Sequence, residues 1–141
     1  MAGLEERPSF EILEHTADIG LRARGRTPEE LFENAAAGLL EILEAAAREG
    51  STDEEIAVEA DDPAALLVRF LDELIYLVDA RGARIATIAV WFDTSTRLRA
   101  HVTWTPSDEP LEGTELKAAT FHQLSLEKRP DGYVATVFFD V

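Results

Sequence analysis

The chain has 141 residues, of which 46% are hydrophobic, and this is enough for one domain with a core of ordinary size. It contains no cysteine, which excludes disulfide bridges, thiolate metal ligands and a cysteine nucleophile. The 13 basic and 28 acidic residues give a formal net charge of −15, which argues against direct, tight nucleic-acid binding and favours a basic protein partner or a divalent cation.

The first part of the chain predicts two strands and a long helix. Residues 10–13 and 19–25 alternate apolar and polar side chains, as half-buried strands do. Residues 27–50 predict a helix with an apolar stripe along one face. Thr27 is a good N-cap at its start, and Gly50 is a natural stop at its end.

The rest of the chain predicts one more helix among five strands. A strand over 56–60 precedes a helix over 61–82, which Asp62 caps and Gly82 ends. Alternation and β-propensity predict further strands at 84–93, 97–106, 114–127 and 133–141. The last of these is apolar on both faces and is therefore expected at the centre of a sheet.

The predicted element order is β-β-α-β-α-β-β-β-β. It indicates an α+β fold with a single domain over residues 1–141. We expect a mostly antiparallel sheet of about six or seven strands with two helices packed against it. No signal-peptide pattern and no apolar run of membrane-spanning length occurs, so a soluble, cytoplasmic protein is expected.

Acidic groups at the C-terminal end are the first candidates for a functional site. Asp140 lies in a strand predicted to be buried, where an unpaired carboxylate is costly. The α-carboxylate of Val141 is next to it, and Asp18 begins a strand that can reach the same rim of an antiparallel sheet. Such an oxygen-only cluster favours Ca²⁺ or Mg²⁺. Ion pairs with Arg22 or Lys117 would also compensate the charge, so both interpretations stay open.

Two histidines and one Glu–Lys pair complete the candidates. His15 and His122 lie in dense polar segments of sheet-like sequence, where a hydrogen-bonded structural role is favoured over a catalytic one. Glu115 and Lys117 share one strand face, which is usual for a surface pair. No glycine-rich nucleotide loop, serine-nucleophile motif or histidine metal motif occurs, so a complete catalytic set is not predicted.

Five segments, in order along the chain, resemble the archease family: LEHTADIGLRARG, TPEELFENAAAGLLEIL, LLVRFLDELIYLVD, GTELKAATFHQLSLE and GYVATVFFDV. The resemblance extends over essentially the whole chain. It implies an accessory protein, rather than an enzyme, that activates an RtcB-type tRNA-splicing RNA ligase. Such a protein promotes ligase guanylylation and multiple turnover. The implied partner is the ligase itself, RNA or tRNA is reached only through the ligase, and no membrane is involved.

The resemblance also implies roles for individual residues. The matched ligands of a divalent metal are Asp18, Asp140 and Val141. The residues implied in activation are Glu115, Lys117, His15 and His122, with His15 supporting a metal ligand through a hydrogen bond. Phe121 stands where the family usually has tyrosine, which removes any hydroxyl role at that position.

Two other functions remain open at this level. The same carboxylates could serve a stand-alone metal-dependent hydrolase, which would act on RNA or nucleotide phosphates without a ligase. The acidic surface could instead belong to a chaperone-like binding module in which a metal is incidental.

Overall fold

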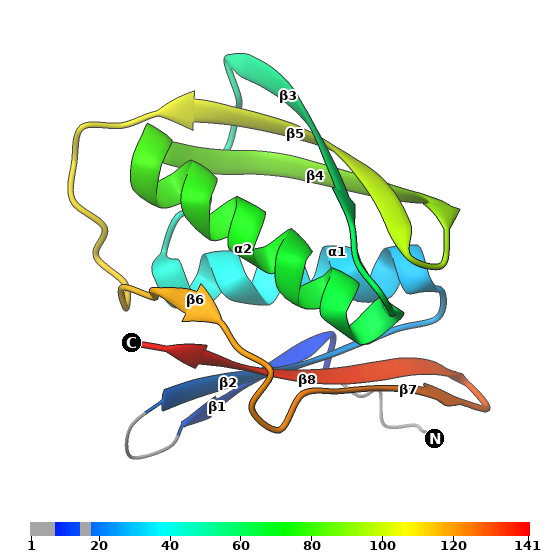
Figure 1. Cartoon of the computed structure of the whole chain (residues 1–141). Coiled ribbons are helices and arrows are strands. Elements are labelled where there is room, and N and C mark those ends of the chain that lie inside the picture. The colour runs from blue at the N-terminus through cyan, green and yellow to red at the C-terminus, as the bar shows by residue number, and fades with distance from the viewer. Residues whose placement is uncertain (1–7, 15–17) are drawn as a thin grey trace, which may run out of the picture.

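The computed structural model describes residues 8–14 and 18–141, and in it two helices lie between two β-sheets (Figure 1). The helices are α1 (Pro28–Leu43) and α2 (Pro63–Arg81). The five-stranded sheet has the order β1-β2-β8-β6, with β7 also on β8, and contains β1 (Phe10–Glu14), β2 (Asp18–Gly25), β6 (Ala118–Ala119), β7 (Ser125–Arg129) and β8 (Gly132–Asp140). The three-stranded sheet has the order β3-β5-β4 and contains β3 (Thr52–Glu59), β4 (Ala83–Thr94) and β5 (Arg97–Pro106).

All the strand pairs of both sheets are antiparallel, which confirms the predicted α+β class. The division into two sheets, in place of one, corrects the sequence prediction. The reason lies in the helices, since nine of the 16 residues of α1 are buried, a wider apolar surface than one sheet can cover. Phe32 of α1 and Phe70 of α2 are fully buried with ring centroids 5.8 Å apart, in the core between the sheets.

Helix α1 begins as predicted and ends earlier. The Thr27 hydroxyl accepts a hydrogen bond from the Glu30 backbone N–H at 3.1 Å, as an N-cap does. The helix stops at Leu43, because Glu44 adopts a left-handed conformation with φ 52°. The alanines that follow have good helix propensity. Instead of continuing the helix, their backbone forms hydrogen bonds with Ile85 at the edge of β4. The predicted helical segment 44–50 is therefore wrong, and tertiary hydrogen bonding explains the error.

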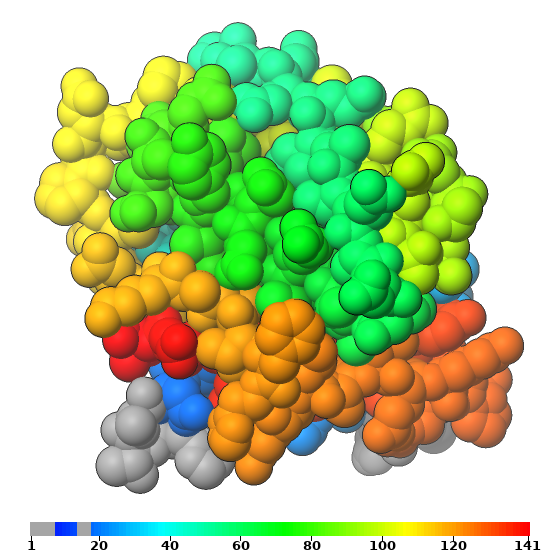
Figure 2. Space-filling model, viewed as in Figure 1, coloured from blue at the N-terminus to red at the C-terminus, as the bar shows by residue number. Residues whose placement is uncertain are grey.

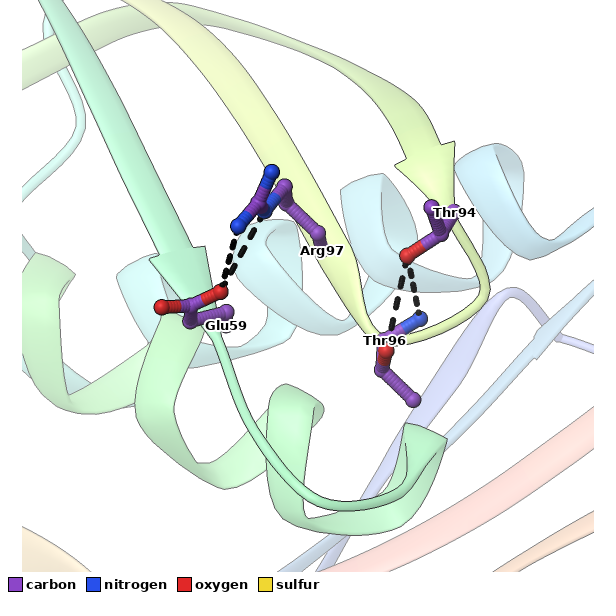
Figure 3. Close-up of polar contacts among 4 residues, drawn as sticks. All are labelled: Glu59, Thr94, Thr96 and Arg97. Carbon is purple, nitrogen blue, oxygen red and sulfur yellow. Dashed lines mark hydrogen bonds and ion pairs between the residues drawn. The ribbon is translucent and has the colours of Figure 1, made fainter.

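Helix α2 matches its prediction at both ends. The Asp62 carboxylate accepts a hydrogen bond from the Ala65 backbone N–H at 2.8 Å. Gly82 ends the helix in a left-handed conformation with φ 66°, and its backbone N–H donates to the Leu77 carbonyl. The helix is followed at once by the β4–β5 hairpin, whose turn includes Thr94 and Thr96 (Figure 3).

The predicted strand over 114–127 is broken into pieces. Only Ala118–Ala119 and the part from Ser125 onward pair with β8, and a loop with Gln123 at φ 53° separates them. The loop forms because Thr120 donates both its backbone N–H and its hydroxyl to the Phe138 carbonyl, each at 2.9 Å. That double contact ends the regular ladder. Strand β8 is central, as predicted, with β2 on one side and β6 and β7 on the other.

Neither helix in the described ranges is long and apolar enough to cross a lipid bilayer.

Candidate metal centre at the end of the five-stranded sheet

Asp18 and Asp140 are brought face to face by the pairing of β2 with β8. The two residues are partners in the antiparallel register, at the point where β2 begins and β8 ends. In Figure 2 these two strand ends, blue and red, reach the surface side by side. Side chains that are direct cross-strand partners have Cβ atoms about 4.5–5.5 Å apart, and like charges in such a pair are destabilising. The predicted convergence of the two carboxylates is therefore present.

The two carboxylates lie at an accessible rim on the outer face of the five-stranded sheet, meaning the face turned away from the helices. Leu21 and Ala23 of β2 are 1% exposed and belong to the core, so the alternate positions, including Asp18, point outward. Asp18 is half-buried and Asp140 is exposed. Val141, which follows directly, is 48% exposed. A donor set of carboxylate oxygens at a surface rim suits a hard divalent cation.

The ion pairs that would compensate these charges are absent from the described part of the chain. Neither Arg22 nor Lys117 forms a salt bridge with Asp18 or Asp140 there. Arg22 instead donates to the Thr136 hydroxyl at 3.3 Å. The described residues also contain no group of three or more His, Asp or Glu side chains arranged to hold a metal. A cation at this rim would thus rest on two side chains and further oxygens such as the Val141 carboxylate.

Asp140 is held in place by the segment around β6. Ala118 is its cross-strand partner on that side, and the Lys117 backbone N–H donates to the Asp140 carbonyl at 2.9 Å. Segment 117–120 is in turn anchored to α2, because Asp72 accepts a hydrogen bond from the Ala119 backbone N–H at 2.7 Å. Burial raises the pKa of Asp72, and this hydrogen bond partly opposes the rise.

The Gly-Thr-Glu segment is fixed by the end of α1. The Thr114 backbone N–H donates to the Ile42 carbonyl at 2.9 Å and so satisfies one of the last helix carbonyls. Gly113 lies directly against the backbone of the last turn, where any side chain would collide with Ile42 and Leu43. The glycine is therefore needed for a close approach, and it sets the position of Glu115.

Glu115 and Lys117 are both exposed on either side of Leu116, which is 4% exposed and packs into the core. The sequence placed them on one face of a strand. In the structure both side chains are exposed, and 114–117 lies outside any strand. Glu115 borders a hollow of about 380 Å³ that Asp79 and Arg84 also line.

His122 lies in the loop after β6, with its ring packed edge-on to Phe138 at a centroid distance of 6.2 Å. Phe138 is the cross-strand partner of Gly20, and this outward-facing pair is next to the Asp18–Asp140 pair along the two strands. A Cβ atom on Gly20 would lie 2.6 Å from the Phe138 ring, so the glycine leaves room for that ring. His122 is exposed and Phe121 beside it is 65% exposed. His15 lies outside the described residues.

Comparison with known proteins decides the family. Residues 10–141 match a model described as the archease protein family. The chain belongs to the archease family. It is 35% identical to the protein archease of Methanosarcina acetivorans over 94% of this chain and 95% of that protein. It is 39% identical to the protein archease of Thermococcus gammatolerans over 87% and 91% of the two chains.

Two solved structures support the archease fold. The solution structure of protein 1598 from Methanobacterium thermoautotrophicum has a TM-score of 0.77 and 25% identity, and the match covers 94% of this chain and 99% of that one. The crystal structure of an archease from Thermotoga maritima, described as a possible chaperone, has a TM-score of 0.66 and 26% identity, with 97% and 98% covered.

Sequence reasoning missed two supports of the rim in this archease-family chain. Asp72 reads as one polar residue on an amphipathic helix, and its contact with Ala119 depends on a segment 47 residues away. Thr114 reads as a strand residue, and its hydrogen bond to Ile42 depends on where α1 ends. An aspartate between the apolar helix positions Leu71 and Leu74 was the one signal that the sequence offered for Asp72.

Proposed function

We propose that this archease-family chain is an accessory protein that activates an RtcB-type RNA ligase in tRNA splicing or RNA repair. Asp18, Asp140 and the carboxylate of Val141 would hold a divalent cation, Ca²⁺ or Mg²⁺, at the rim. The ligase is the protein partner, and the cytoplasm is the expected compartment. The proposal is carried by one observation, the cross-strand pairing of Asp18 with Asp140 at an exposed sheet end.

The charge of the rim supports a role for a cation. Two carboxylates in one cross-strand pair repel each other, and the described residues supply no ion pair to offset that repulsion. A bound cation would offset it and would supply positive charge able to polarise phosphoryl oxygens in the partner's reaction centre. Both aspartates are fixed by ladder hydrogen bonds, so the rim is organised before any partner docks.

Exposed side chains around the rim suit contact with a protein. Glu115, Lys117 and His122 are exposed and belong to segments tied to α1, α2 or β8. The chain's overall charge of −15 complements a ligase whose RNA-binding cleft is basic. This archease-family chain would thus dock its acidic rim near that cleft and promote guanylylation and multiple turnover.

The test is a guanylylation and RNA-joining assay with the cognate ligase. Asp18→Asn and Asp140→Asn should each abolish the acceleration while the fold is retained. Glu55→Gln is a matched control, since it removes one charge from an exposed site on the three-stranded sheet. If Asp18→Asn accelerated the ligase as well as the unmodified chain, the proposal would be wrong.

A chaperone-like role is the second candidate, because a Thermotoga maritima archease is described as a possible chaperone. Two large exposed side chains, Phe121 at 65% and Tyr76 at 61%, also favour protein binding. Activation that persists in the presence of a chelator would support this role over the metal-centred one. Turnover of RNA phosphates without any ligase would instead indicate a stand-alone hydrolase.

A further inference from the structure

A row of arginines occupies the outer face of the five-stranded sheet, at the end away from Asp18 and Asp140. Arg22 and Arg24 alternate with the buried residues of β2, so both side chains point outward. Arg26 follows directly after β2, and Arg129 belongs to β7 on the far side of β8. This arginine strip, Arg22, Arg24, Arg26 and Arg129, contrasts with the acidic character of the chain as a whole.

The strip lies along two adjoining hollows. One, of about 400 Å³, is lined by Arg24, Arg26, Arg129 and Tyr133 among others. The other, of about 300 Å³, is lined by Arg22, Arg24 and Arg129. Arg24 and Arg129 border both hollows, so the two hollows are neighbours, and together we call them the groove. The smaller hollow lies among outward-facing residues of β2, β7 and β8, and the larger one also reaches Glu30 and Asn34 of α1.

Part of the positive charge in the strip is not neutralised. Arg24 pairs with Glu11 at 2.7 Å and Arg129 pairs with Glu127 at 3.0 Å. Arg22 and Arg26 form no salt bridge with any carboxylate of the described residues. The hydrogen bond from Arg24, followed by the charges of Arg24 and Arg22, lowers the pKa of Glu11, so this one carboxylate faces two guanidinium groups.

In the described part of the chain, carboxylates around the groove equal the four arginines in number, since Glu11 and Glu127 pair with Arg24 and Arg129 and two more line the larger hollow. Glu30 and Asp131 also line the larger hollow. One carboxylate oxygen of Glu30 accepts a hydrogen bond from the Arg26 backbone N–H at 2.9 Å. That bond does not involve the Arg26 guanidinium group. The arrangement suits an anion that contacts Arg22 and Arg26, the two strip arginines without an ion pair among the described residues.

We propose that the arginine strip binds the phosphodiester backbone of a single-stranded RNA segment. Alternate residues of a strand lie roughly 6.6 Å apart, comparable with the separation of successive phosphates along a nucleic-acid strand. Guanidinium groups contact phosphate through two parallel hydrogen bonds, and Arg22, Arg24 and Arg129 border one hollow. The choice of RNA over other polyanions rests on the proposed function as an RNA-ligase activator.

The contact is local and weak in the isolated protein. The net charge of −15 repels a polyanion at long range, so the strip alone does not give tight binding. Once a ligase holds both the RNA and this chain, the contact becomes intramolecular and its effective concentration rises. The acidic rim and the arginine strip lie toward opposite ends of one sheet face, so a protein at the rim can leave the strip open to the RNA it carries.

The test is an NMR titration of the chain alone with an oligouridylate at low salt, following backbone and arginine side-chain signals. We expect perturbations to cluster at the strip and to be weaker, at the same oligouridylate concentration, in an Arg22→Gln/Arg26→Gln variant. Neither arginine has an ion-pair partner among the described residues, so this variant strands no carboxylate there. Arg97→Gln is the matched control on the other sheet, where Arg97 already pairs with Glu59 at 2.9 Å (Figure 3).

The salt dependence gives a second readout. For binding to a single strand, each phosphate contact contributes about 0.7 to the slope with which log K falls as log salt concentration rises. The double variant lacks two such contacts and should therefore lower this slope by about 1.4. Absence of perturbations at the strip, or a double variant that binds like the control, would overturn the proposal. Equal perturbation by polyglutamate would also overturn it in favour of an acidic protein partner. Since no ligase is present, failure here is separate from failure of the proposed activation.

Discussion

The carboxylate of Asp72, in the middle of α2, accepts a hydrogen bond of 2.7 Å from the backbone N–H of Ala119 in β6. Ala118 and Ala119 are the β6 residues that pair with Asp140 and Phe139 at the end of β8. One half-buried side chain therefore links the helical layer to the strand end that carries the candidate metal ligand. Asp72 thus supports this strand end from the helical side of the sheet.

Replacing Asp72 with alanine should loosen this link. The Ala119 N–H would lose its partner, and a buried donor left unsatisfied costs about 1–3 kcal/mol of unfolding free energy. We expect a lower free energy of unfolding in denaturant titration, together with faster amide exchange at residues 118–120. Glu73→Ala, at an exposed neighbouring position, is the control and should change stability little. Equal stability of the two variants would contradict a structural role for the Asp72 bond.

Asp72→Asn should give a pH-dependent stability difference. Because burial raises the pKa of Asp72 in the folded state, the folded protein binds the proton more tightly than the unfolded chain. The stabilising contribution of this proton is complete below the unfolded pKa and is lost as the pH rises through the folded pKa. Asparagine keeps an oxygen acceptor and has no proton to lose. The variant should therefore gain stability relative to the unmodified chain on going from acidic to neutral pH, as urea unfolding can measure.

An unchanged stability difference across that pH range would contradict the assigned direction of the pKa shift. All other side chains are the same in the two proteins. Subtracting the two stability curves isolates Asp72.

Local signals in the sequence were sufficient for the parts of the fold that local forces determine. Asp62 caps the start of α2 and Gly82 ends the helix, as predicted, because both make their contacts within a few residues along the chain. The end of α1 was not predictable in this way. Continuation of the helix competes with two hydrogen bonds to Ile85 of β4, in which the Ala45 carbonyl accepts and the Ala47 N–H donates, and only the folded chain supplies them. The second sheet was not predicted for the same reason, since pairing between strands far apart in the sequence produces no local sequence pattern.

The pairing of the two rim aspartates was predictable from the sequence, and the contacts that hold the surrounding segments were not. Asp18 and Asp140 stood out because each places a carboxylate at the end of a strand, and the register confirms that they meet. The roles of Asp72 and Gly113 depend on contacts with segments far along the chain, and single-sequence reasoning does not reach such contacts.

Gly113→Ala should disturb the Gly-Thr-Glu segment. The added methyl group would overlap the Ile42 carbonyl oxygen and lie 2.5 Å from the Leu43 carbonyl carbon, and both are backbone atoms at the end of a helix. Overpacking of this kind typically costs about 1–3 kcal/mol. We expect a lower melting temperature and a displaced Glu115, seen as altered amide shifts at 114–117. Glu112→Ala, one residue earlier and exposed, should leave both measurements unchanged. A fully stable Gly113→Ala variant would show that the approach to α1 is not tight.

Asp140→Asn should have opposite effects in the absence and presence of a divalent cation. Without metal, the substitution removes one of two like charges in a cross-strand pair, and stability should rise by roughly 0.2–1 kcal/mol. With Ca²⁺ or Mg²⁺ at 100 times its dissociation constant, the unmodified chain should gain about 2.7 kcal/mol, and the variant should gain little. Thermal unfolding with and without chelator measures both effects. Glu55→Gln, with the same charge change on the other sheet, should keep the full response to metal. If Asp140→Asn responded to metal as strongly as Glu55→Gln does, the cation would bind elsewhere than between β2 and β8.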